Sequence, residues 1–189
     1  MIEASQLQAL RRAVFERGNG AAEAPVFAVL DGAMVADLPE RLRAAGCDYS
    51  CLFSGDLDPM LEAAAPHLVR LRADDRFTDA ILREGWNAHW GIVLRTAPGT
   101  DLYAVRHHLR RFLRVIGADG KAMFFRFYDP RAFRVVIPTL GGAERRDFFG
   151  PVQGFVVEDA AADSALVYAR GGPAGGQRVT LATAATGMA

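Results

Sequence analysis

The sequence predicts a single α/β domain in which a mixed β-sheet is flanked by helices, with a hairpin-rich C-terminal part. Apolar runs of strand length alternate with helical periodicity up to about residue 114. Beyond that point short strands follow one another across turn signals such as Asp119-Gly120. A chain of 189 residues suits one domain. We therefore predict a folded domain at 1–170 and a flexible Gly/Ala-rich tail at 171–189.

Helices are expected where apolar residues recur at helical spacing between a cap and a breaker. Gly18-Asn19-Gly20 ends the first one, and Asp37 with Pro39 begins the second. Either Asp56 or Asp58 caps the third. The predicted helices are 3–17, 38–45, a short one ending at 65, 77–83, 102–114 and 130–137.

Strands are expected in the short apolar runs between these helices and in the runs that follow. The predicted strands are 26–30, 49–53, 67–71, 90–94, 115–116, 123–128, 153–157 and 166–169. Residues 178–181 would add an edge strand, and Gly141-Gly142 is expected in a loop.

The charges balance over the whole chain but not along it. Lys+Arg and Asp+Glu both number 22, which argues against a strongly basic protein held to nucleic acid by bulk charge. Residues 101–134 nevertheless hold eight basic and three acidic residues, a net charge of +5. Lys121 is the only lysine, so the positive charge is almost entirely guanidinium, which pairs with carboxylates and is common at protein interfaces.

The N-terminus lacks the basic and apolar regions of an export signal, and no apolar stretch approaches the length of a membrane span. A cytoplasmic protein without membrane contact is therefore expected. Cys47 and Cys51 lie too far apart along a strand to form a disulfide with each other, so both are predicted to be free, buried thiols.

Searches for catalytic and metal-binding motifs predict no catalytic residues, no metal and no cofactor. Residues 117–122 contain a Gly-Lys pair but lack the spacing of a phosphate-binding loop, and no Gly-x-Ser-x-Gly elbow occurs. The four histidines lack metal-ligand spacing. Asp31 ends the first strand, where α/β enzymes place acids, but the second aspartate of a phosphatase is missing.

The helix at 102–114 has an apolar stripe and an opposite basic face. We predict that four arginines on or beside that face bind a partner: Arg106, Arg110, Arg111 and Arg114. A solvated helix face and a nucleic-acid contact are the alternatives. Overall neutrality and the shortage of lysine favour an acidic protein partner over nucleic acid.

A series of motifs along the chain points to a family. Its centre is the string Phe125-Arg126-Phe127-Tyr128-Asp129-Pro130-Arg131. Upstream lie Leu30-Asp31-Gly32 and Trp90-Gly91-Ile92, and downstream lies Phe148-Phe149-Gly150-Pro151-Val152. In this order and spacing, from Val26 to Asp159, the chain resembles the type VI secretion effector-adaptor family, catalogued as a domain of unknown function.

The resemblance implies a cytoplasmic adaptor, also called an effector chaperone, that performs no catalysis. Such an adaptor binds a secreted toxic effector and helps load it onto the VgrG spike. The family has an α/β lobe and a helical C-terminal lobe. About thirty residues follow Asp159 here, so we expect the helical lobe to be absent or vestigial. An apolar patch left by its absence would allow a homodimer.

The central string also has a physical interpretation. On a strand, Arg126 shares a face with Phe124 and Tyr128, and its guanidinium needs a partner such as Asp129 or Asp31. The motif residues expected to hold the fold are Asp31, Trp90, Gly91, Arg126, Tyr128, Asp129, Pro130, Arg131, Phe149, Gly150 and Pro151. The alternative function is a small α/β enzyme or ligand-binding domain for an anionic small molecule that uses Asp31, His89 and Arg126.

Overall fold

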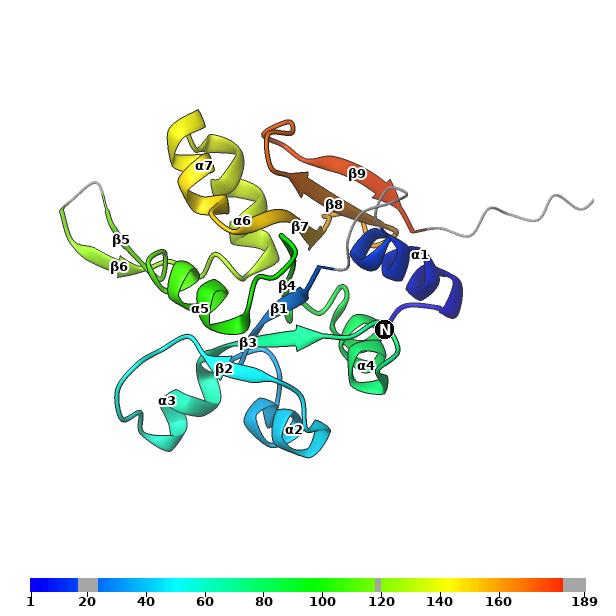
Figure 1. Cartoon of the computed structure of the whole chain (residues 1–189), viewed down its shortest axis with the longest axis horizontal. Coiled ribbons are helices and arrows are strands. Elements are labelled where there is room, and N and C mark those ends of the chain that lie inside the picture. The colour runs from blue at the N-terminus through cyan, green and yellow to red at the C-terminus, as the bar shows by residue number, and fades with distance from the viewer. Residues whose placement is uncertain (17–23, 118–119, 182–189) are drawn as a thin grey trace, which may run out of the picture.

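The computed structural model describes residues 1–16, 24–117 and 120–181. They form a single α/β domain, which confirms the predicted fold class (Figure 1). A seven-stranded sheet runs through the middle in the order β2-β3-β1-β4-β7-β8-β9, and β5 and β6 form a separate two-stranded hairpin at one side. The signals at Gly18-Asn19-Gly20 and Asp119 fall outside the described residues.

The elements follow the predicted order closely. The helices are α1 (Ala4–Phe15), α2 (Leu38–Ala45), α3 (Pro59–Ala64), α4 (Arg76–Gly85), α5 (Leu102–Arg110), α6 (Pro130–Val136), a 3-10 turn (Ile137–Thr139) and α7 (Gly142–Phe149). The strands are β1 (Val26–Asp31), β2 (Tyr49–Cys51), β3 (Pro66–Leu71), β4 (Gly91–Thr96), β5 (Arg114–Ile116), β6 (Ala122–Phe124), β7 (Val152–Glu158), β8 (Ser164–Ala169) and β9 (Gln177–Thr180).

The strand directions differ from the mixed sheet that the sequence suggested, because every pairing in the described sheet is antiparallel. The reason is the position at which each helical connection returns the chain to the sheet. β3 and β4 run in the same direction, but β1 lies between them. Likewise β3 separates β1 from β2. Helix and strand therefore alternate along the chain without placing two parallel strands side by side.

The sheet is buried on both faces, and alternate residues of β1 divide between two cores. Val26, Ala28 and Leu30 join the core that packs under α1, α2 and α4. Phe27 and Val29 join the core under α5, α6 and α7, which is rich in aromatic rings. Side chains that alternate along a strand therefore lie on opposite sides of the molecule.

Three segments depart from the sequence prediction. α5 ends at Arg110 instead of continuing to residue 114, and β6 ends at Phe124, so most of the central string is a turn rather than a strand. Residues 142–149 form α7, where no helix was expected. The edge strand suggested at 178–181, by contrast, is present as β9, which pairs with β8 at the edge of the sheet.

Candidate partner-binding groove

The four arginines predicted to form one basic face are spread over different surroundings. Arg106 is half-buried, and its Nε donates to the Cys51 carbonyl oxygen at 2.9 Å, which ties α5 to β2. Arg111 lies just beyond α5 and pairs with Asp147 at 2.9 Å. Arg110 ends the helix and is half-buried.

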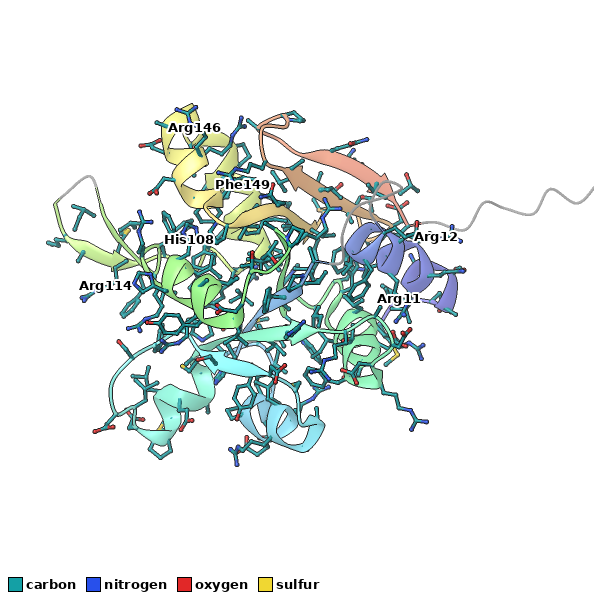
Figure 2. The ribbon with its side chains drawn as sticks, in the orientation of Figure 1. Arg11, Arg12, His108, Arg114, Arg146 and Phe149 are labelled. Atoms are coloured by element: carbon teal, nitrogen blue, oxygen red, sulfur yellow. The ribbon has the colours of Figure 1, made fainter. Side chains whose placement is uncertain are left out.

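Arg114 does not lie on the helix, as the sequence predicted, because the chain leaves α5 at Arg110 and enters β5. Its guanidinium lies over the Phe124 ring, 5.7 Å from the centroid. Figure 2 shows Arg114 at the hairpin, well away from Arg146 on α7. The predicted face is therefore divided between a helix that contacts the sheet and an exposed hairpin.

The Arg126 guanidinium donates to the Asp31 carboxylate, which is one of the two partners expected for it. Asp31 is 1% exposed and also accepts the Ala33 backbone N–H at 3.0 Å, whereas the Arg126 side chain is 44% exposed. The hydrogen bond from Arg126 to Asp31 raises the pKa of the guanidinium, so Arg126 keeps its charge. The pair therefore joins the end of β1 to the segment after β6.

The other motif residues build the turn around this pair. Asp129 caps α6 by accepting the Arg131 backbone N–H at 2.9 Å, and it pairs with the Arg131 guanidinium at 2.7 Å. Burial acts to raise the pKa of Asp129, but the hydrogen bonds from Arg131 outweigh it and lower the pKa. Burial raises the pKa of Tyr128 to about 12. Pro130 opens the helix.

Trp90 and Gly91 lie at the start of β4. The Arg41 guanidinium lies over the Trp90 ring, 4.9 Å from its centroid. A Cβ at Gly91 would collide with the Val29 carbonyl oxygen on the neighbouring strand. Glycine at this position therefore allows β4 to approach β1.

Phe149, Gly150 and Pro151 join α7 to β7. Phe149 is buried in the aromatic core. Gly150 has a φ of 47°, and a Cβ there would collide with the His108 ring. That imidazole lies against α7, with Nε2 2.8 Å from the Phe148 carbonyl oxygen (Figure 2 labels His108 and Phe149). This junction thus requires glycine for both its conformation and its packing.

A groove of about 230 Å³ opens above the Asp31–Arg126 pair. The β5–β6 hairpin contributes Phe124 to its lining and α3 contributes Leu61 and Ala64, and we call these two elements its walls. Its apolar lining comes from segments far apart in the sequence: Phe53, Leu61, Leu113, Phe124, Phe125 and Tyr128. We call it the hairpin groove. The centroids of the Phe53 and Phe124 rings are 5.7 Å apart, so two of the lining residues are in aromatic contact.

The two walls of the hairpin groove are unusually exposed. None of the residues of α3 is buried, and all three residues of β6 are exposed. Arg114 pairs with Phe124 and Ile116 with Ala122, so the side chains of both pairs share one face of the hairpin. On that face Ile116 is 72% exposed and Phe124 is 67% exposed. Large apolar side chains are therefore presented to solvent along one wall.

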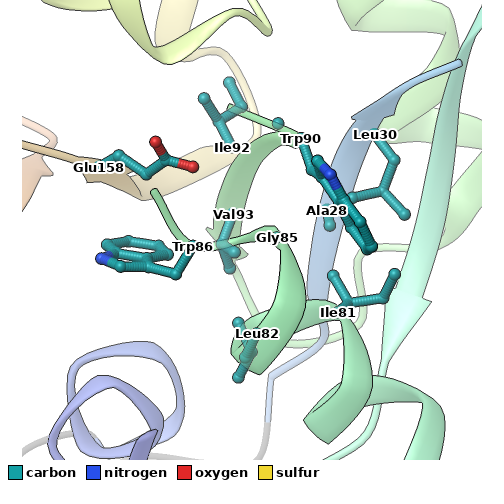
Figure 3. Close-up of a pocket in the computed structure, with 11 residues that line it drawn as sticks. Ala28, Leu30, Ile81, Leu82, Gly85, Trp86, Trp90, Ile92, Val93 and Glu158 are labelled. Carbon is teal, nitrogen blue, oxygen red and sulfur yellow. The ribbon is translucent and has the colours of Figure 1, made fainter. Parts of the chain in front are cut away.

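A second, smaller pocket lies on the opposite face of the sheet, between α4 and the strands (Figure 3). It holds the buried Glu158 carboxylate, which lies 2.7 Å from Nδ1 of His89 and accepts the His89 backbone N–H at 3.1 Å. Burial raises the pKa of Glu158 against the opposing effect of the His89 hydrogen bond. The indole N–H of Trp86 on this pocket's wall has no hydrogen-bond partner among the described residues.

The structure brings together only two of the three residues suggested for an enzyme. Asp31 and Arg126 pair in the hairpin groove, whereas His89 binds Glu158 at the pocket on the other face. In the described part of the chain, no three His, Cys, Asp or Glu side chains are grouped as a metal ion would require. Cys47 and Cys51 are free thiols and only half-buried.

Sequence reasoning missed most of the groove lining. Leu61 fell in a helix whose apolar residues had no assigned neighbour, and Phe124 was placed on a longer strand. The available signal was a short helix and a short hairpin whose apolar residues do not form a full apolar stripe. Nothing in the sequence pattern placed these two elements opposite each other.

Within the described ranges, no helix is both long enough and apolar enough to cross a membrane. Comparison with curated proteins and with solved structures gave no match. A family model described as "Domain of unknown function (DUF4123)" matches residues 26–147, well over half of the chain. The matched range contains every residue that lines the hairpin groove. The chain therefore belongs to the family of domains of unknown function DUF4123.

Proposed function

We propose that this protein is a cytoplasmic, non-enzymatic adaptor that binds a type VI secretion effector and helps load it onto the VgrG spike. The motif series that resembles the effector-adaptor family runs from Val26 to Asp159 and overlaps the matched family range of 26–147. The exposed apolar hairpin groove adds a physical reason, because contiguous apolar surface on a folded protein commonly marks a protein-binding site.

The observation that carries the proposal is the exposure of both groove walls. A short helix and a two-stranded hairpin gain most of their stability from packing, and neither α3 nor β6 buries a side chain within this chain. A protein partner that filled the groove would supply the missing contacts. Acidic groups on that partner would meet Arg114 and the exposed side of Arg126.

Co-purification tests the proposal directly. The tagged protein is expressed in a host that also carries the effector and spike genes neighbouring its own gene, and the bound proteins are identified by mass spectrometry. We expect a stable complex with the effector, the spike or both. The same host with the two neighbouring genes deleted is the control. Recovery of neither protein contradicts the adaptor function.

A further inference from the structure

We propose that the hairpin groove binds a protein segment in which a large apolar side chain lies next to a carboxylate. The apolar side chain enters between Phe53, Leu61 and Phe124, and the carboxylate faces the hairpin wall. This inference rests on the proposed function in one respect, that the occupant is a partner protein. It adds the chemistry of the segment and the side of the groove to which each part binds.

The apolar part of the proposal follows from the lining. Leu61 on α3 and Phe124 on β6 both line the groove, and the Phe53 ring is packed beside Phe124. Removing these carbons from water is favourable in proportion to the apolar area that a partner covers. A large aliphatic or aromatic side chain covers more of that area than a small one does.

The acidic part of the proposal follows from the charges of the walls. Arg126 uses a terminal nitrogen for Asp31, and its partly exposed guanidinium keeps further donors for a second carboxylate. Asp31 balances the charge of Arg126, so the net positive charge of this wall comes from Arg114 above Phe124.

The groove lining is apolar apart from the Asp31–Arg126 pair, and the unbalanced charge beside it is that of Arg114 over the Phe124 ring. A segment whose carboxylate lies on the hairpin side gains attraction from Arg114. A lysine in the same position would be repelled. The position of Arg114 at the hairpin therefore gives the groove a directional preference as well as a chemical one.

Two short synthetic peptides test the inference. Both carry the same Leu and Phe residues, and one has Glu at the flanking positions where the other has Lys. Binding to the isotope-labelled full chain is followed by NMR. We expect the Glu peptide to shift the signals of Phe53, Leu61 and Phe124 and to bind at least about tenfold more tightly than the Lys peptide.

Charge reversal on the protein separates this interpretation from a loss of structure. Arg114→Glu should lower the affinity for the Glu peptide and raise the affinity for the Lys peptide. Misfolding would not produce opposite changes for the two peptides. Arg146→Glu, on exposed α7, is the matched control and should leave both affinities unchanged. Arg126 is not replaced, because its loss would leave the buried Asp31 carboxylate unpaired.

The inference is overturned by equal affinity for the two peptides or by signal shifts confined to another surface. It is also overturned if millimolar citrate alone displaces the Glu peptide, or if the chain without peptide forms a dimer that buries Phe124. The peptides derive from neither effector nor spike. If the effector or spike co-purifies equally well with the Phe124→Asp variant, the groove is excluded as the binding site and the adaptor function stands. If the chain binds the Glu peptide but recovers neither effector nor spike, the inference about the groove stands and the adaptor function is contradicted.

Discussion

At the scale of single residues, the Asp31–Arg126 pair connects the sheet to the groove. Asp31 is almost fully buried at the end of β1, and its partner reaches it from a segment that contributes no strand to that sheet. Losing one member of such a pair leaves the other without compensation. This pair should therefore matter for stability as well as for the shape of the groove floor.

Asp31→Asn should lower the free energy of unfolding by about 2 kcal/mol, because the Arg126 guanidinium loses its carboxylate partner. Asp147→Asn breaks the exposed pair with Arg111 and should cost less than about 0.5 kcal/mol. Urea denaturation followed by circular dichroism measures both. Equal costs for the two substitutions would show that burial of the Asp31 pair contributes nothing.

The buried His108 imidazole should make stability depend on pH. Burial lowers its pKa below the ordinary 6.5, despite the hydrogen bond to Phe148. Below about pH 6.5 the unfolded chain binds more protons at this site, so the site's contribution to folding is lost as pH falls. The raised pKa of Glu158 acts in the opposite direction. The effect must therefore be measured as a difference between variants.

His108→Gln should flatten the decline in the free energy of unfolding between about pH 6.5 and pH 5 relative to the parent chain. His107→Gln, on the exposed side of the same helix, should leave the decline unchanged. Thermal or urea unfolding across this pH range gives the comparison. Parallel curves for the parent chain and the His108 variant would exclude His108 as the titrating group.

At the scale of elements, the groove walls contrast with the sheet that supports them. β1, β4 and β7 lie in the interior of the sheet with nearly all their residues buried, whereas α3 and β6 bury none. Local opening requires little free energy where few apolar contacts are lost. The walls should therefore open far more often than the sheet in the absence of a partner.

Amide hydrogen exchange should be fast in α3 and β6 and slow in β1, β4 and β7 of the free protein. Addition of a partner that binds the groove should slow exchange in both walls together. Mass spectrometry of peptic fragments measures both states. Protection of α3 and β6 equal to that of β1 without any partner would show that the walls are already stable.

The sequence predicted most elements because each has a local signal, such as Asp129-Pro130 at the start of α6. It missed α7, whose few buried residues, Phe148 and Phe149, lie at its end and leave no periodic stripe. The pairing of Arg126 with Asp31 rather than Asp129 depends on where β1 ends in space. The groove was missed for the same reason, since Leu61 and Phe124 meet only in the folded chain.

At the scale of the whole molecule, one sheet separates two cores and connects them through strands such as β1, whose residues alternate between the two. Both tryptophans, Trp86 and Trp90, belong to the side under α1, α2 and α4. Phe133 is fully buried on the other side, where its ring contacts Phe148, Phe155 and Tyr168. The strands between them should make the two sides unfold together.

Phe133→Leu should lower the free energy of unfolding by about 1 kcal/mol through poorer packing of the aromatic core. Tryptophan fluorescence reports from the opposite side of the sheet. If the domain unfolds as one unit, fluorescence and circular dichroism should show the same shifted urea midpoint. A fluorescence midpoint that stays at the parent value would mean that the two cores unfold separately.

The hairpin wall of the groove has a further consequence. Since β6 packs nothing into either core, the choice of side chains there is governed by what lies outside the chain. Related domains of this family can therefore diverge at this hairpin while keeping the same scaffold. Exchanging the hairpin between two such domains would show directly whether this element decides what each of them binds.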